Sequence, residues 1–69
     1  MAESVYKIIE LVGTSTESWE KAVSGAIERA SKTLRDIRVA EVTMLDMHID
    51  KGKITYRAKL KLSFKFEGK

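Results

Sequence analysis

The chain has 69 residues and a mass of 7.8 kDa, with 43% apolar and 33% charged residues and neither Cys nor Pro. This composition fits a single domain spanning residues 1–69 and excludes collagen-like, low-complexity and disulfide-stapled chains. The net charge is +3, but residues 1–52 carry 7 Lys and Arg against 9 Asp and Glu, whereas residues 53–69 carry 6 against one. The positive excess therefore lies in the last quarter of the chain.

The chain opens with an extended segment. Residues 5–12 are rich in β-branched and aromatic side chains and end at Gly13, a pattern that predicts a strand. The next residues are typical of a helix start, which we expect to be capped by Ser15 or by Thr14 together with Glu17.

A helix of about 18 residues follows, because apolar residues recur at steps of three and four. This apolar stripe consists of Trp19, Ala22, Val23, Ala26, Ile27, Ala30 and Leu34. We expect Trp19 to pack in the core or in an interface.

Two further strands are predicted over residues 37–49 and 53–66. Residues 50–53 contain Gly52 and predict a tight turn, so the second of these strands returns antiparallel to the first. The returning strand alternates between apolar and mostly basic residues. Strict alternation in the first would place one set of side chains on the same face: Ile37, Val39, Glu41, Thr43, Leu45, Met47 and Ile49.

The predicted fold is therefore α+β, a β-α-β-β subunit whose three-stranded antiparallel sheet wraps around one helix. Strands of about 13 residues extend roughly 43 Å, while the helix covers only about 27 Å. One helix cannot cover such a sheet. We expect the remaining apolar surface to be buried against copies of the same chain.

Four segments carry a resemblance to a known family: residues 5–15, the Ala-rich helix, residues 38–42 and residues 63–67. In order and spacing they resemble the dodecins, small β-α-β-β proteins that assemble into hollow homododecamers. Many dodecins store or buffer flavins. The resemblance implies a homododecamer and a small bound ligand.

Three positions depart from the flavin-binding members. Val39 stands where those members place a Trp that stacks on the flavin ring, and Val offers no π face. Arg57 stands where they have a Gln, and Asp46 where they have an Arg. Val39, Arg57 and the nearby Met44 mark the family's flavin pocket, and their identities argue against flavin binding of the family type.

Asp46 has two interpretations. If the chain turns around Gly52, positions 46 and 57 lie nearly opposite each other, which predicts a cross-strand Asp46–Arg57 ion pair. Alternatively, the flavin-lacking pattern resembles the calcium dodecins. A hard cation needs several oxygen ligands, and in a dodecamer one carboxylate near a threefold axis is presented three times, so a single Asp or Glu can form a site. The candidate metal ligands are Asp46, Glu10, Glu41 and Asp50.

The remaining features point to no catalysis. His48 is the only His, and without Cys no nucleophile–base pair is available. The Lys59, Lys61 and Lys65 stripe suggests either a nucleic-acid contact or a solvated strand face, and we favour the latter because no aromatic residues interleave on that face.

We expect a non-enzymatic dodecamer that binds and stores calcium or another divalent cation. The alternatives are storage of flavin or another aromatic ligand in a rearranged pocket, and a structural oligomer without a ligand. Residues 1–4 lack a signal-like layout, and no apolar run is long enough for a membrane. We expect a cytoplasmic protein with no nucleic-acid or membrane partner.

Overall fold

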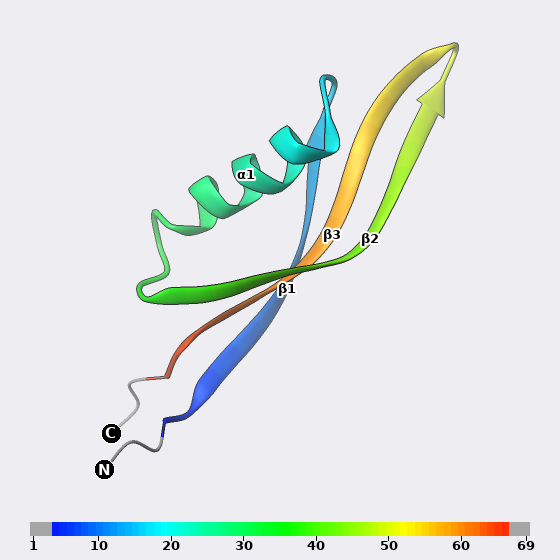
Figure 1. The fold of residues 1–69 in the computed structure, drawn as a ribbon. Helices are drawn as coiled ribbons and strands as arrows, with labels where there is room; N and C mark the ends of the chain where they lie inside the picture. The colour runs from blue at the N-terminus through cyan, green and yellow to red at the C-terminus, as the bar shows by residue number, and fades with distance from the viewer. Residues whose placement is uncertain (1–3, 67–69) are drawn as a thin grey trace.

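The computed structural model describes residues 4–66, which form four elements in the order strand, helix, strand, strand (Figure 1). Their bounds are β1 Tyr6–Ser15, α1 Trp19–Ala30, β2 Ile37–Asp50 and β3 Lys53–Lys65. Two segments considered in the sequence lie partly outside the described residues: residues 1–4, where no signal-like layout is expected, and the family-like segment at residues 63–67.

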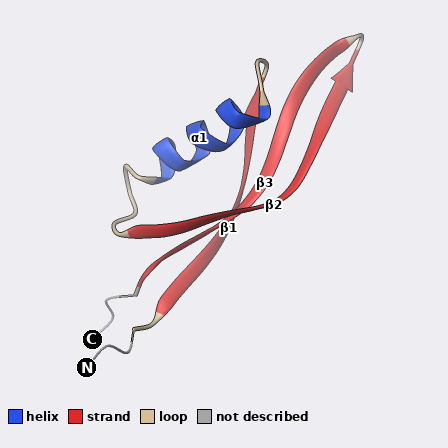
Figure 2. Ribbon diagram, in the orientation of Figure 1, coloured by secondary structure: helices blue, strands red, loops and turns tan. Residues whose placement is uncertain are grey.

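The three strands form one antiparallel sheet in the order β1-β3-β2, and α1 lies against one of its faces (Figure 2). The centre of the core is β3, where Ala58, Leu60 and Leu62 are fully buried. We call the face that carries these residues the helix-side face, and the opposite face, which carries Arg57, Lys59 and Lys61, the outer face. The predicted α+β fold is confirmed.

The close packing of α1 on β1 depends on Gly13. A Cβ atom at this position would lie 2.2 Å from the backbone oxygen of Ala22 and 3.0 Å from the Cβ of Ala26. Ala22 is the one buried residue of α1. The strand is therefore predicted correctly, but it continues through Gly13 to Ser15. At Gly13 the absence of a side chain lets α1 pack directly against the strand.

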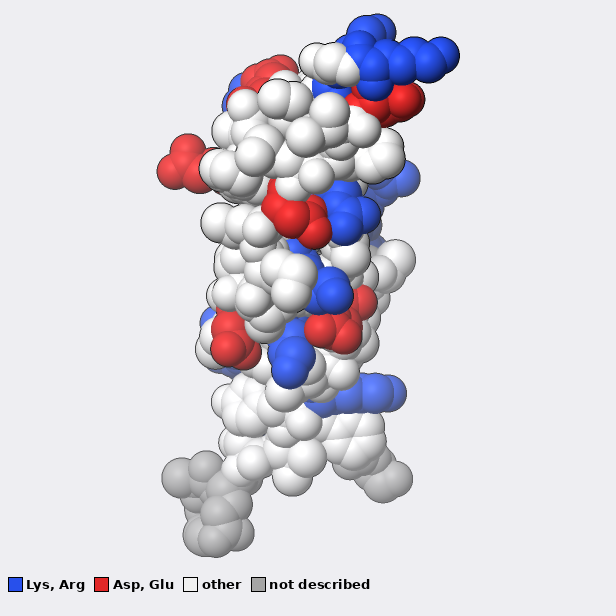
Figure 3. All heavy atoms as spheres, turned by 90° about the vertical axis from the view of Figure 1, so that its right-hand side faces the viewer, with Lys and Arg blue, Asp and Glu red and all other residues white. Residues whose placement is uncertain are grey.

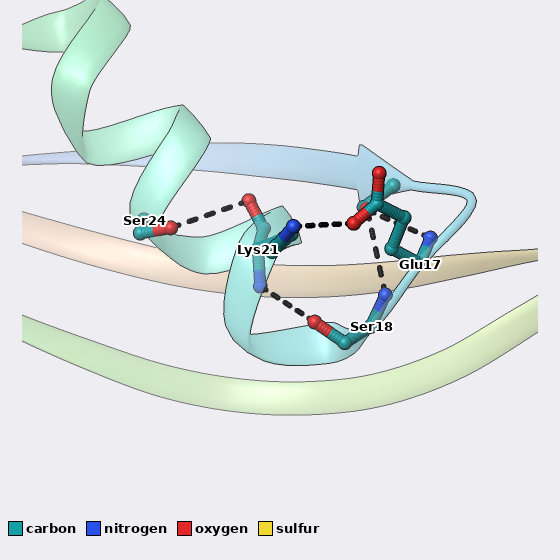
Figure 4. Close-up of polar contacts among 5 residues, drawn as sticks. Glu17, Ser18, Lys21 and Ser24 are labelled. Atoms are coloured by element: carbon teal, nitrogen blue, oxygen red, sulfur yellow. Dashed lines mark hydrogen bonds and ion pairs between the residues drawn. The ribbon is translucent and has the colours of Figure 1, made fainter.

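The helix cap lies three residues later than the predicted cap at Ser15. The N-cap is Ser18, whose hydroxyl accepts a hydrogen bond from the Lys21 N–H at 3.0 Å (Figure 4). Ser15 instead accepts from the N–H groups of Glu17 and Ser18, at 3.0 and 3.4 Å, and so closes the preceding turn. The prediction of a cap at Ser15 or Thr14 is wrong because the Ser15 hydroxyl is used in that turn.

The helix also ends earlier than predicted, giving 12 residues instead of about 18. The Ser31 hydroxyl donates to the Ile27 oxygen at 2.8 Å, and the Leu34 N–H bonds to the Ala30 oxygen at 2.8 Å. The chain thus leaves α1 through further turns that still bring Leu34 to a half-buried position. The apolar stripe is confirmed, although its last member lies beyond the helix.

Two irregularities in β2 overturn the expected strict alternation. Ile37 pairs with Phe64 and Val39 with Ser63, and the same shift recurs between Val42 and Met44, so Arg38 and Thr43 are extra residues. Each β-bulge reverses the phase of the faces. As a result β2 turns two sets of residues to opposite faces: Ile37, Ala40, Val42, Leu45, Met47 and Ile49 on the helix side, and Val39, Glu41, Met44, Asp46, His48 and Asp50 outward.

The predicted tight turn joins β2 to β3. Lys51 and Gly52 have φ values of 52° and 80°. Two consecutive residues with positive φ match the right-handed twist of a two-residue hairpin. The turn fixes the pairing of Asp50 with Lys53 and, through it, the register along the rest of the hairpin.

The subunit is elongated, with extents of 54 × 21 × 16 Å and a radius of gyration of 14.3 Å, against about 11 Å for a compact domain of this length. Its accessible surface is 5620 Å², whereas a folded monomer of this mass exposes about 4,400 Å². With 12 residues, α1 falls short of what a membrane crossing needs, and the described residues hold no other helix.

Candidate functional site on the outer face of the sheet

All seven candidate site residues lie on the outer face. Partners across an antiparallel sheet project to the same side, and each candidate either belongs to the outer set of β3 or pairs with one of its members. The pairs are Asp46–Arg57, Met44–Lys59, Glu10–Lys61, Glu41–Lys61, Val39–Ser63 and Asp50–Lys53. Figure 3 shows acidic and basic side chains interspersed along this face.

The predicted pairing of Asp46 with Arg57 is present and bidentate. Arg57 Nε donates to Asp46 Oδ1 at 2.8 Å and Arg57 Nη2 donates to Asp46 Oδ2 at 2.9 Å. The two side chains remain 41% and 46% exposed. The hydrogen bonds from Arg57, together with its positive charge, lower the pKa of Asp46, and the same contact raises the pKa of Arg57.

On the helix side of the sheet, the backbone of Asp46 contacts Trp19, the only Trp of the chain. Trp19 Nε1 donates to the backbone oxygen of Asp46 at 3.0 Å, and its ring meets that of Tyr56 edge to face, with centroids 5.0 Å apart. The start of α1 is therefore joined to both β2 and β3. The sequence indicated packing for Trp19 but not this bond. Trp19 lies on the opposite side of the sheet from Val39.

Glu10, Lys61 and Glu41 form a row across the three strands. Lys61 on the central strand has Glu10 of β1 on one side and Glu41 of β2 on the other. Within residues 4–66 the ion pairs are Asp46–Arg57 and Glu17–Lys21. The three side chains of this row are therefore neighbours without a direct ion pair.

Other candidates remain far apart in one subunit. Val39 pairs with Ser63, six residues along β3 from Arg57, a separation of about 20 Å. Asp50 lies at the hairpin end opposite Lys53. Residues 4–66 contain no group of three or more His, Cys, Asp and Glu side chains placed to hold a metal ion. Within one subunit the described residues therefore do not bring these candidates together.

The β-α-β-β order, the β1-β3-β2 sheet and its single helix define a small α+β subunit with an uncovered sheet face. The family model of the dodecins matches residues 5–67. The chain belongs to the dodecin family.

Curated relatives agree with this assignment. Calcium dodecin from Mycobacterium tuberculosis is 56% identical over 63 residues, covering 90% of this chain and 89% of the relative. A dodecin from Thermus thermophilus is 42% identical over 64 residues, covering 91% and 93%.

Solved structures give the same result. The crystal structure of calcium dodecin from Mycobacterium tuberculosis, described as calcium-chelating and as having a novel calcium-binding site, has a TM-score of 0.86 at 54% identity, with 93% of both chains covered. The dodecin of Streptomyces coelicolor has a TM-score of 0.92 at 37% identity over the whole of both chains.

Proposed function

We propose that the chain forms a non-enzymatic homododecamer that binds and stores calcium or another divalent cation. The observation that carries the proposal is that the four candidate carboxylates all lie on the outer face of the sheet. Calcium is supported by the 56% identical relative, which is named calcium dodecin.

Assembly is part of this proposal because one subunit offers a hard cation too few free oxygens. Calcium takes about six to eight oxygen ligands. In the subunit each candidate carboxylate lies opposite a cation of its own chain, namely Arg57, Lys61 or Lys53. Copies arranged around a symmetry axis would bring the same carboxylate together several times. Calcium therefore fits these residues only in the assembled protein.

Calorimetric titration with calcium tests the proposal. We expect Asp46→Asn, Glu10→Gln or both to weaken binding by about tenfold or more, since removal of even a supporting residue at a metal site has an effect of that size. Glu17→Gln is the matched control, because Glu17 lies in the turn between β1 and α1, outside the strands that carry the candidate carboxylates. Light scattering reports whether each variant is still a dodecamer.

Unchanged affinity in both outer-face variants would remove these residues from the site. An intact dodecamer that gives no calcium signal would instead support a structural oligomer without a ligand.

A flat aromatic ligand such as a flavin is the second candidate function. The outer face carries the exposed side chains of Val39 and Met44, which are 57% and 53% accessible and offer apolar area to a ring. Absorbance and fluorescence of the purified protein separate the two functions. We expect a colourless protein, and a yellow preparation that releases flavin on denaturation would overturn the flavin-free proposal.

We further propose a cytoplasmic protein without a nucleic-acid partner. The absence of Cys is compatible with a reducing compartment. Lys61 lies between Glu10 and Glu41, which supports the interpretation of the lysine stripe as a solvated strand face. The sheet also brings one aromatic residue, Tyr6, opposite Lys65. The expectation that no aromatic residue lies among the lysines therefore holds for β3 alone. A gel-shift assay at low and moderate salt is expected to show no retained complex.

A further inference from the structure

The free edge of β1 carries a row of backbone groups that face away from the sheet. The Val5 oxygen accepts a hydrogen bond from the Phe66 N–H at 2.8 Å, and hydrogen-bonded and non-hydrogen-bonded pairs alternate along an antiparallel ladder. The odd-numbered residues of β1 therefore bond to β3. The even-numbered residues turn their N–H and C=O groups to the edge, where no further strand lies within residues 4–66: Tyr6, Ile8, Glu10, Val12 and Thr14.

The two edges of the sheet differ in regularity. From Tyr6 to Ser15, β1 pairs with β3 without a register shift. The other edge strand, β2, is interrupted by the bulges at Arg38 and Thr43. Bulges on an edge strand hinder the addition of another strand, whereas a regular edge permits it. The edge that can accept an added strand is therefore β1.

A cleft of about 640 Å³ opens along this same edge, between β1 and α1. On the β1 side it is lined by Leu11 and Gly13 of the helix-side face and also by Val12 and Thr14 of the outer face, so it reaches around the free edge. A Cβ atom added at Gly25 would meet nothing within 4 Å, so side chains from outside have room here. On the α1 side the lining is small apart from one cation: Ala22, Gly25, Ala26, Ala30 and Arg29.

We propose that this edge binds an extended peptide of another protein, which adds to the sheet as a fourth strand antiparallel to β1. Peptides are commonly recognised in this way, with main-chain hydrogen bonds giving affinity and alternate side chains giving specificity. Half of the peptide's side chains would enter the cleft, and the other half would lie on the outer face. This interaction is separate from the proposed cation binding.

The side chains along the edge define the chemistry of the peptide. Glu10 lies between Ile8 and Val12, which are 61% and 54% exposed, so the matching outer residues are apolar, basic and apolar in turn. On the cleft side, the apolar lining favours small apolar residues. A second copy of the chain matches less well, because the antiparallel register that pairs residues 6–14 completely sets Glu10 opposite Glu10.

The probe is a fluorescently labelled peptide, Ser-Ala-Val-Ala-Lys-Ala-Val-Ala-Ser, whose binding to the full chain as purified is followed by fluorescence anisotropy. Its Lys is placed opposite Glu10, and its two Val residues opposite Ile8 and Val12. The N–H groups of these three peptide residues then face β1, because they are partners of residues whose own backbone groups face the edge. The N–H groups of the two Ala residues beside the Lys point away.

Backbone methylation gives a matched pair of probes. N-methylation of the Lys and both Val residues should weaken binding by about tenfold or more, because it removes main-chain hydrogen bonds. N-methylation of the two Ala residues beside the Lys should leave binding nearly unchanged. A peptide with Glu in place of Lys should bind the parent chain more weakly and should regain affinity with Glu10→Lys.

The chain offers a matched pair of variants as well. Gly25→Leu fills the cleft and should weaken binding by about tenfold. Glu28→Leu adds the same side chain to α1 at an exposed residue outside the cleft lining, and should bind as the parent chain does. Light scattering and circular dichroism check that both variants keep the size and secondary structure of the parent protein.

Several outcomes would overturn the inference: no saturable binding of the probe, equal effects of the two methylation patterns, or unchanged affinity in Gly25→Leu. Amide hydrogen exchange tests the competing occupant. The N–H groups of Glu10 and Val12 should exchange quickly in the free protein and slowly with the probe bound. Slow exchange without the probe would mean that a second copy already holds the edge, and would reject the peptide.

Discussion

Asp46 of β2 and Arg57 of β3 are direct cross-strand partners joined by two hydrogen bonds between carboxylate and guanidinium. The backbone oxygen of Asp46 also accepts the indole N–H of Trp19. One position of the hairpin thus ties its two strands together on the outer face and holds the helix on the other face.

The ion pair makes stability depend on acid pH. The pKa of Asp46 is lowered from 3.8 by hydrogen bonding to Arg57. A lowered folded-state pKa means that the pair stabilises the fold above pH 3.8 and that this contribution is lost as the pH falls through the lowered value. We expect Asp46→Asn to lower the urea midpoint slightly at pH 7, and we expect its difference from the parent chain to shrink as the pH falls through the lowered pKa of Asp46.

A double variant provides the control for this prediction. With Arg57→Gln already in place, Asp46→Asn should have little further effect at pH 7. A gap between the urea midpoints of the parent chain and Asp46→Asn that does not shrink with acidification would contradict the role given to the pair.

Gly13 and Gly25 form a matched pair of glycines. Gly13→Ala should destabilise the chain by about 1–3 kcal/mol, because the new Cβ would collide with the backbone oxygen of Ala22 and force α1 away from β1. Gly25→Ala meets nothing within 4 Å in α1 and should stabilise it by about 0.5–1 kcal/mol. Urea denaturation measures both effects, and changes of the same sign would contradict the proposed close approach.

The two faces of β3 should differ in their tolerance of truncation. Leu60 is fully buried, so Leu60→Ala should lower the free energy of unfolding by about 2–5 kcal/mol. Its neighbour Lys59 points outward, and Lys59→Ala should change that free energy by less than about 0.5 kcal/mol. Thermal and urea denaturation give the comparison, and similar losses would argue against the assigned faces.

The indole hydrogen bond can be isolated by conservative changes. Trp19→Phe keeps an aromatic ring against Tyr56 but removes the donor to the Asp46 oxygen, and should reduce stability by about 1 kcal/mol. Tyr56→Phe keeps the ring and leaves the bond intact, so it should be nearly neutral. Circular dichroism follows unfolding, because the first variant has no Trp fluorescence. Equal effects of the two changes would mean that the hydrogen bond contributes little.

The features that sequence predicted well are local or follow from a local one. The alternation of residues 53–66 reflects a central strand with one buried face, and burial of Leu60 and Leu62 confirms it. The Lys51–Gly52 turn sets the register of the hairpin, so counting outward from it correctly placed Asp46 opposite Arg57. Neither prediction required knowledge of distant contacts.

The features that the sequence did not predict are ones for which several residues fit the same pattern and only the folded structure decides between them. Ser15 and Ser18 both suit a helix cap, and the turn after β1 decides which hydroxyl is free. The bulges at Arg38 and Thr43 were missed because no residue type at these positions is by itself diagnostic of a bulge. Glu41 gave an indirect signal, because strict alternation placed it among apolar side chains.

The candidate residues were predicted from the family resemblance, and their common location follows from the fold. Glu10 and Glu41 are 31 residues apart in the sequence but flank Lys61, since β1 and β2 both pair with β3. A cation site built from several copies depends on contacts between chains, and the sequence pattern of one chain does not predict such contacts.

The two bulges make β2 two residues longer than the part of β3 with which it pairs, because Arg38 and Thr43 are extra residues in the ladder. Removing Thr43 would leave Val42 opposite Leu60 and Met44 opposite Lys59 in a regular ladder, so every neighbouring side chain would keep its side of the sheet. What would change is the bend, because a bulge sharpens the local twist of its strand. Single-residue deletions at these two points should therefore alter the curvature of the subunit more than its chemistry, and in the proposed assembly this would change the angle at which neighbouring copies meet.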